Sequence, residues 1–194
     1  MNSQNLKQET HPLPPFLPEG AKVLMLGSFP PQRKRWSMDF FYPNLNNDMW
    51  RIMGIIFSGD KNRFLNETKK AFNREEIIVF LNEKRIAIFD TATVVCRLND
   101  NASDKFLEIV QATDINALLD RIPHCNAIVA TGQKATEILT KQLNISEPKI
   151  GEFAEFLHNN NVMRFYRMPS SSRAYPLKLE SKAEFYGKMF REIL

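Results

Sequence analysis

The sequence predicts an α/β protein, a three-layer α/β/α sandwich around a central, mainly parallel sheet of about four strands. Short apolar runs that end in a polar or turn residue recur along the 194 residues, which is typical of buried strands. Segments with the apolar spacing of helices separate these runs. Strands that alternate with helices favour parallel pairing through right-handed crossovers, which covers both faces of the sheet.

The predicted strands occupy the apolar runs of the chain. They lie at residues 21–27, 85–90, 126–132 and 161–169. Helices are predicted at residues 48–57, 74–84, 114–122, 133–143 and 181–194. Asn73 is expected to cap the second helix, and Ser181 with Glu184 has the capping-box pattern for the last. Because ligands of open α/β sheets bind beyond the carboxyl ends of the strands, the loops after the four strands are the expected site.

Composition indicates an ordinary globular chain. Residues 1–20 are polar and then proline-rich, so they are predicted as an extended lead-in, and residues 21–194 as a single domain. The two cysteines lack metal-ligand spacing, which favours a reducing cytoplasm. No apolar run approaches the roughly 20 residues that span a bilayer, and no signal-peptide pattern opens the chain. The net charge of +4 gives a mild bias toward polyanions such as nucleic acid.

The first of these loops, "GSFPP" at residues 27–31, combines a glycine that permits close approach with two stiffening prolines. It lacks the glycine spacing of a phosphate-binding loop or a dinucleotide fingerprint, which disfavours a nucleoside triphosphate or NAD. The basic run Arg33, Lys34 and Arg35 follows it. This run is either a solvated loop or a contact to phosphates.

Two interpretations stay open for the second loop, "FFYPNLNNDMW" at residues 40–50. In one, Asn46 or Asn47 caps the following helix and Asp48 complements the helix dipole. In the other, asparagine amides, which both donate and accept, hold a planar polar ligand. The aromatic side chains that offer flat faces for stacking a base are Phe40, Phe41 and Tyr42.

The third loop begins at Asp90, whose carboxylate either caps a turn or accepts a ring N–H from the edge of a base. The fourth, "MPSSSRAYP" at residues 168–176, is either a linker or a source of hydroxyls for phosphates and of a side chain that wedges into a duplex. A serine hydrolase is disfavoured, because no G-x-S-x-G elbow is present and no histidine lies in the four loops. The histidines are His11, His124 and His158.

Taken in order, these loops resemble the motifs of the uracil-DNA glycosylase superfamily, and their pattern comes nearest to the branch that includes hypoxanthine-DNA glycosylases. "GSFPP", "FYPNLNNDMW" and "MPSSSRAY" stand where that branch has "GSxPG", "YYAHPRNxFW" and "LPSTSPAN". "IAIFDTATVVCR" and "ATGQKA" are similar to its "LWD…R" and "NGxxA" segments. The resemblance covers roughly residues 20–190.

The resemblance implies an enzyme of base-excision repair that flips a deaminated base, uracil or hypoxanthine, out of DNA and hydrolyses its N-glycosidic bond. Asn47 matches the position of the catalytic asparagine of that branch. Asn44 and Asn46 are alternatives, because the match depends only on the number of residues that separate the asparagine from Trp50. The predicted base pocket consists of Phe29, Phe41, Tyr42, Asn44 and Asp90. The predicted DNA contacts are Ser28, Arg33, Lys34, Arg35, Ser170, Ser171, Ser172 and Arg173.

Two positions depart from other branches of the superfamily. Phe29 stands where those branches place a water-activating Asp or Asn, and Met168 where some place a histidine that stabilises the departing base. Neither side chain orients water, so an active enzyme would position the water with Asn47, with Asp48 and Asp39 as further candidates beside it. The alternative hypothesis is therefore a catalytically silent DNA-binding member of the same fold. A third hypothesis is a protein that binds a free nucleobase or nucleoside.

The leading hypothesis is a monofunctional glycosylase, because no lysine stands in the four loops to form a Schiff base. It is expected to need no metal or other cofactor and to act as a monomer in the cytoplasm. Its expected partner is DNA that contains a damaged base.

Overall fold

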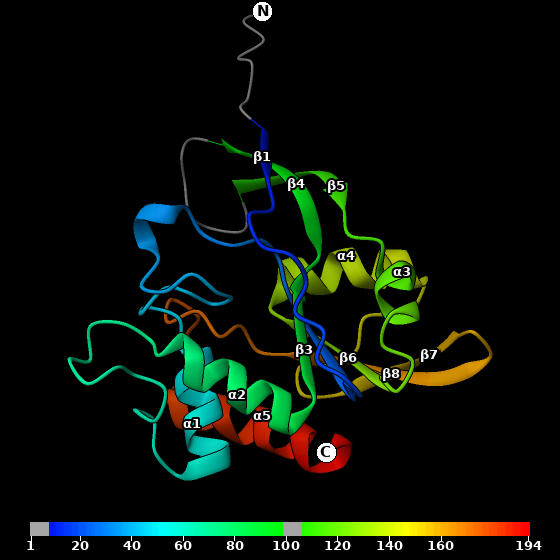
Figure 1. Cartoon of the computed structure of the whole chain (residues 1–194). Coiled ribbons are helices and arrows are strands. Elements are labelled where there is room, and N and C mark those ends of the chain that lie inside the picture. Colours follow the sequence, from blue (N-terminus) through cyan, green and yellow to red (C-terminus); the bar gives the residue numbers. More distant parts are fainter. Residues whose placement is uncertain (1–7, 99–105) are drawn as a thin grey trace, which may run out of the picture.

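A central five-stranded sheet forms the middle layer of the protein (Figure 1). The computed structural model describes residues 8–98 and 106–194. The strand order is β3-β2-β6-β8-β7. Four neighbouring strands are parallel: β3 (Ile86–Asp90), β2 (Val23–Gly27), β6 (Ala127–Thr131) and β8 (Asn161–Met168). These four confirm the predicted strands.

The prediction of about four strands was wrong, because β7 (Phe153–His158) adds a fifth at the edge, antiparallel to β8. Strands β2, β3 and β6 are buried along their whole length, so they stand out as apolar runs. Strand β7 has only one buried residue, Phe156. An edge strand with one solvated face lacks the continuous apolar run by which the others were found.

A second sheet of three antiparallel strands, in the order β1-β4-β5, lies beside the first. It consists of β1 (Gln8–Thr10), β4 (Ala92–Arg97) and β5 (Leu107–Ala112). The segment after Asp90 was predicted as a loop, and this was wrong for β4; the part of it from residue 99 onward lies outside the described residues. Residues 1–7 of the predicted lead-in also lie outside them, while residues 8–10 pair with β4.

Five helices of the described residues cover the central sheet: α1 (Met49–Ser58), α2 (Arg74–Lys84), α3 (Ile115–Asp120), α4 (Gln133–Leu143) and α5 (Leu179–Ile193). Figure 1 shows α1, α2 and α5 on one side of the sheet and α3 and α4 on the other. The Asn73 cap is confirmed, since its side chain accepts from the Glu76 N–H. The capping box of Ser181 and Glu184 was wrong: α5 begins at Leu179, which packs against the core, so Ser181 lies inside the helix.

The register of the parallel strands brings their carboxyl ends to one edge of the sheet. Gly27 pairs with Asp90, and Thr131 pairs with Met168. The ends of these four strands therefore lie side by side, as expected for a ligand site of an open α/β sheet. Within the described ranges, no helix has both the length and the apolar character to cross a membrane.

Candidate functional site

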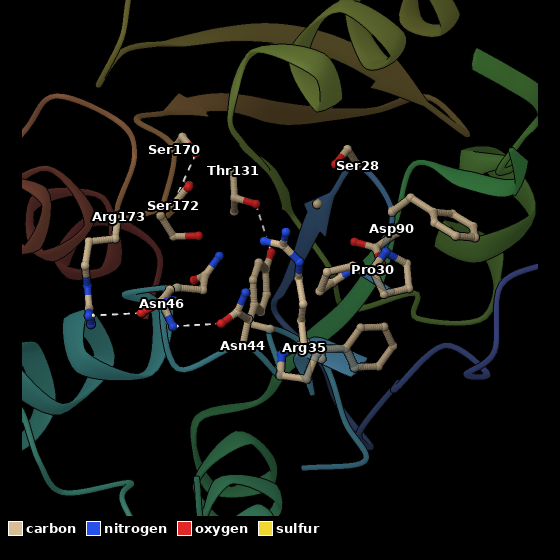
Figure 2. A pocket seen from close by; sticks show the side chains of 18 of the residues that line it. Ser28, Pro30, Arg35, Asn44, Asn46, Asp90, Thr131, Ser170, Ser172 and Arg173 are labelled. Carbon is tan, nitrogen blue, oxygen red and sulfur yellow. Dashed lines mark hydrogen bonds between the residues drawn. The ribbon is translucent and has the colours of Figure 1, made fainter. Parts of the chain in front are cut away.

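A cavity of about 440 Å³ opens at the carboxyl edge of the central sheet (Figure 2). The predicted site residues that line it are Ser28, Phe29, Arg35, Phe41, Tyr42, Asn44, Asn47, Asp90, Ser170, Ser171, Ser172 and Arg173. The predicted DNA contacts Arg33 and Lys34 lie outside its lining. Residues more than 140 positions apart in the chain thus share one pocket of a size that holds a small planar ligand.

The floor of the cavity contains the Asp90 carboxylate, which is 6% exposed. Its Oδ2 lies 2.9 Å from Nε2 of His11, whose side chain is 3% exposed. The His11 ring packs edge-on against Phe29 and lies 4.6 Å from the Phe89 ring. No local signal in the sequence pointed to His11, because it precedes Asp90 by 79 residues and lies in the lead-in, outside the four loops.

Close packing explains why strand β2 ends in a glycine, Gly27. A Cβ at this position would overlap Oδ1 of Asp90 and contact the hydroxyl of Tyr42. The missing side chain therefore leaves room for the two polar groups that come from other elements. The glycine is a consequence of close packing at the floor of the cavity, because its φ is not in the left-handed region.

Tyr42 and Thr131 form a polar pair on the cavity wall. Thr131 Oγ1 donates to the Leu26 carbonyl at 3.2 Å, so the Tyr42 hydroxyl donates to Thr131 Oγ1 at 2.9 Å. Tyr42 has a φ of 49°, a left-handed conformation that is uncommon for a residue with a bulky side chain. Such backbone strain is concentrated at functional sites. Thr131 lines the cavity but was not among the predicted site residues, although it lies in the "ATGQKA" segment.

Asn44 and Asn47 of the second loop line the cavity, and backbone N–H groups occupy their side-chain oxygens. Asn44 Oδ1 accepts from the Asn46 N–H at 2.9 Å, and Asn47 Oδ1 accepts from the Met49 N–H at 2.9 Å. Because both carbonyl oxygens accept from backbone N–H groups, the side-chain NH₂ groups are left to donate. Asn47 therefore bonds the first N–H of α1 and lines the cavity at the same time. The prediction that Asn46 or Asn47 is the cap residue was wrong by one position or more, because Asp48 stands at the N-cap, and the holding of a planar ligand stays a prediction.

Asp48 is buried in an ion-pair network behind the cavity wall and does not line the cavity. Its Oδ2 lies 3.1 Å from Nζ of the fully buried Lys182, and its Oδ1 lies 3.2 Å from Nε of Arg173. Its backbone N–H donates to the Ser171 carbonyl, and Lys182 donates to the Ser172 carbonyl. The network fastens the fourth loop to the start of α1.

Arg51 adds a third cation to this network. It donates to the carbonyls of Leu45 and Asn47. Burial lowers the pKa of its guanidinium, and the nearby Arg173 lowers it further, while Asp48 raises it. Three cations around one carboxylate leave an excess of positive charge at this rim of the cavity.

The three basic residues after the first loop differ in their surroundings. Arg33 pairs with Asp39 and stacks on Trp36, with its guanidinium carbon 4.0 Å from the ring centroid. Asp39 is exposed and lies outside the cavity lining. Arg35 is the one that reaches over the cavity in Figure 2. An exposed cation at the mouth of a pocket suits a polyanionic ligand.

The two departures from the resemblance differ in position. Phe29 lines the cavity, and Met168 is buried and does not line it. Among the described residues, Asp90 is the one carboxylate in the lining, and no lysine lines the cavity. No group of three or more His, Cys, Asp or Glu side chains within residues 8–98 and 106–194 is arranged to hold a metal ion.

No protein-family model matches the sequence, and no curated protein matches it. A solution structure of a protein from Methanosarcina acetivorans, described as a candidate uracil DNA glycosylase, is similar to the whole fold. The two chains are 23% identical, the match covers 92% of this chain and 94% of that chain, and the TM-score is 0.61. The α/β fold implied by the resemblance of the four loops is therefore the fold that this chain has.

Proposed function

We infer that this protein is a cytoplasmic, monofunctional DNA glycosylase that removes a deaminated base, uracil or hypoxanthine, from DNA. One observation carries the inference: the four loops that resemble glycosylase motifs line a single cavity at the carboxyl edge of the sheet. The fold similarity to a candidate uracil DNA glycosylase supports it. A base that has been flipped out of the duplex would enter this cavity.

The proposed reaction is a hydrolysis. The oxygen of a water molecule forms a bond to C1′ of the flipped nucleotide as the bond between C1′ and the base nitrogen breaks. The electron pair of the broken bond leaves with the base, the water loses a proton, and the departing base takes up a proton. The products are the free base and an abasic site in an unbroken strand.

In this proposal, Asn47 positions the attacking water molecule. Its Oδ1 has a second lone pair beside the bond from Met49, and its Nδ2 makes no hydrogen bond within the described part of the chain. The Asn44 amide also presents its donors to the cavity, where they would stabilise negative charge on the departing base. Asp48 is bound to Lys182 and Arg173, so it is a structural group in this proposal.

DNA would be held by the rim of the cavity. Arg35, Ser170 and Ser172 line the cavity and stay accessible to solvent, so the phosphates beside a flipped nucleotide would pass here, whereas Ser171 is buried. Hydroxyl and guanidinium donors are the usual partners of phosphate oxygens. The absence of lysine from the described lining supports a monofunctional enzyme, since a Schiff base needs an amine at C1′.

A second candidate function is DNA binding without catalysis. The observation that favours it is the chemistry of the lining: Phe29 occupies the first loop, and the one lining carboxylate, Asp90, is engaged by His11. Such a protein would bind the same DNA and leave the glycosidic bond intact.

A single-turnover assay on labelled oligonucleotides tests the two functions. The substrates carry uracil, hypoxanthine or xanthine, and alkali after the reaction reveals abasic sites. Wild type is compared with Asn47→Ala and Asn44→Ala, and Asn46→Ala serves as the matched control, since all three amides lie in the lining. Cleavage that depends on alkali, is lost in Asn47→Ala, is reduced in Asn44→Ala and survives in Asn46→Ala supports the proposed enzyme and its catalytic residue.

Other outcomes redirect the assignment. Loss of cleavage in Asn44→Ala or Asn46→Ala with Asn47→Ala active would move the catalytic role to that asparagine. Salt-sensitive binding without cleavage of any substrate would favour the silent DNA-binding protein. Strand cleavage before alkali, trapped by borohydride, would exclude a monofunctional enzyme.

A further inference from the structure

The Asp90 carboxylate has two oxygens in different surroundings. Oδ2 accepts from Nε2 of His11 at 2.9 Å. Oδ1 lies next to Gly27 and has no hydrogen bond to any described residue. Among the described residues, no buried side-chain nitrogen or oxygen lacks a partner. Oδ1 is therefore not sealed off, and the opening it meets is the cavity that Asp90 lines (Figure 2).

His11 holds this arrangement in place. Its second ring nitrogen, Nδ1, lies 2.8 Å from the Leu13 carbonyl oxygen and 3.2 Å from the Leu13 backbone nitrogen, so the Leu13 backbone holds the ring from the opposite side. The ring is enclosed by Phe29, Phe41 and Phe89. A carboxylate rotates freely when both its oxygens are solvated, and a donor on one oxygen in an apolar enclosure removes that freedom. The imidazole thus fixes the direction in which Oδ1 faces the cavity.

A carboxylate oxygen in a dry pocket discriminates between ring nitrogens. An ionised carboxylate accepts hydrogen bonds and cannot donate them. A base in the lactam form carries a ring N–H that satisfies Oδ1. A base with a lone pair at the same ring position, such as cytosine or adenine, would cover Oδ1 without donating to it and would be repelled by it.

We propose that His11 is a positioning residue for base selection: it fixes Asp90 so that Oδ1 admits bases with a ring N–H and rejects bases with a ring lone pair. This rests on the proposed function, because it specifies the substrate class of the same cavity. It also makes the N-terminal segment around β1 part of the site, although this segment precedes all four loops.

The test measures binding, so that it does not depend on catalysis. The probes are oligonucleotides that carry 2′-fluoroarabino-uridine, its N3-methyl form or 2′-fluoroarabino-cytidine, whose glycosidic bonds resist hydrolysis. A tetrahydrofuran abasic analogue reports on DNA contacts without a base. Wild type is compared with His11→Leu, which removes the donor, and His11→Gln, which keeps an N–H donor. Thermal unfolding checks that each variant folds.

Wild type is expected to prefer uridine over N3-methyluridine and over cytidine by about 10- to 100-fold. His11→Leu is expected to lose most of this preference and to bind the abasic analogue as wild type does, and His11→Gln is expected to restore part of it. A preference that survives in His11→Leu would overturn the proposal. Equal weakening on all probes, the abasic analogue included, would also overturn it, because it indicates a merely structural role.

A further experiment with free bases separates the failure of this inference from the failure of the proposed function. If wild type binds none of the oligonucleotides, the glycosylase assignment fails, and uracil and 3-methyluracil are then titrated into the protein and followed by NMR. A preference for uracil that His11→Leu removes would still support the selection by His11 and Asp90. Equal responses to both bases, or responses unchanged in His11→Leu, would overturn it.

Discussion

Lys182 Nζ lies 3.1 Å from Asp48 Oδ2, with the two side chains 1% and 7% exposed. This pair joins the last helix to the residue next to Asn47 and also supports the Ser172 carbonyl. A buried charge that loses its partner keeps its desolvation cost and loses its compensation. The ion pair is thus the structural link between the second and fourth loops of the site.

We expect Lys182→Met to lower the free energy of unfolding by roughly 2–4 kcal/mol, since it strands Asp48 with Arg173 as its one remaining ion-pair partner. Urea denaturation measures the loss. The double variant Asp48→Asn with Lys182→Met is the control, because it removes both charges, and its loss is expected to be smaller than the sum of the single losses. If the losses of the single variants Lys182→Met and Asp48→Asn add up to the loss of the double variant, the two side chains are not energetically coupled.

Asn47 combines a structural and a proposed chemical role, and two substitutions separate them. Asn47→Ala removes the acceptor of the Met49 N–H and is expected to cost about 1 kcal/mol of stability. Asn47→Asp keeps an oxygen acceptor and is expected to unfold near the wild-type denaturant midpoint. Both are expected to lower the single-turnover glycosylase rate by about 100-fold or more, since both remove the amide donor. An active Asn47→Asp would show that the amide nitrogen is not needed.

Gly27 is expected to tolerate no side chain, because a Cβ would displace the Asp90 carboxylate. Gly27→Ala is expected to abolish the preference for bases with a ring N–H and to cost about 1–3 kcal/mol of stability from overpacking. Gly59→Ala is the matched control: Gly59 has a φ of 70° and nothing within 4 Å of a new Cβ, so alanine there is strained but remote from the cavity. Fluorescence-detected unfolding and binding are compared for the two. Unchanged selectivity in Gly27→Ala would contradict the close packing at the floor.

Arg35 and Arg33 are expected to contribute unequally to DNA binding. Arg35 lines the cavity, whereas Arg33 stacks on Trp36 and pairs with Asp39. Arg35→Ala is expected to reduce the slope of log affinity against log salt by about 0.9, the loss of one phosphate contact to duplex DNA. Arg33→Ala is expected to change the slope less. Titrations at several salt concentrations measure both, and equal slopes for the three proteins would exclude a phosphate contact by Arg35.

The local sequence was sufficient to predict the central elements of the fold. Helix α2 begins and ends where the apolar spacing and the Asn73 cap placed it, and α4 matches its prediction as well. Strands β2, β3 and β6 are buried on both faces, so their apolar runs are readable without knowledge of their neighbours. The loops at their carboxyl ends followed from the alternation of strands and helices.

The tertiary structure alone decided the partners of the site's charged groups. His11 meets Asp90 across 79 positions of the chain, and Lys182 meets Asp48 across 134. Neither contact has a local signature, because a buried pair of polar side chains depends on which elements pack together and not on spacing within one of them. The sequence by itself determined the strands, the helices and the loops that carry the polar groups. Packing of distant segments determined which of these groups are buried in pairs and which, like Oδ1 of Asp90, face the cavity.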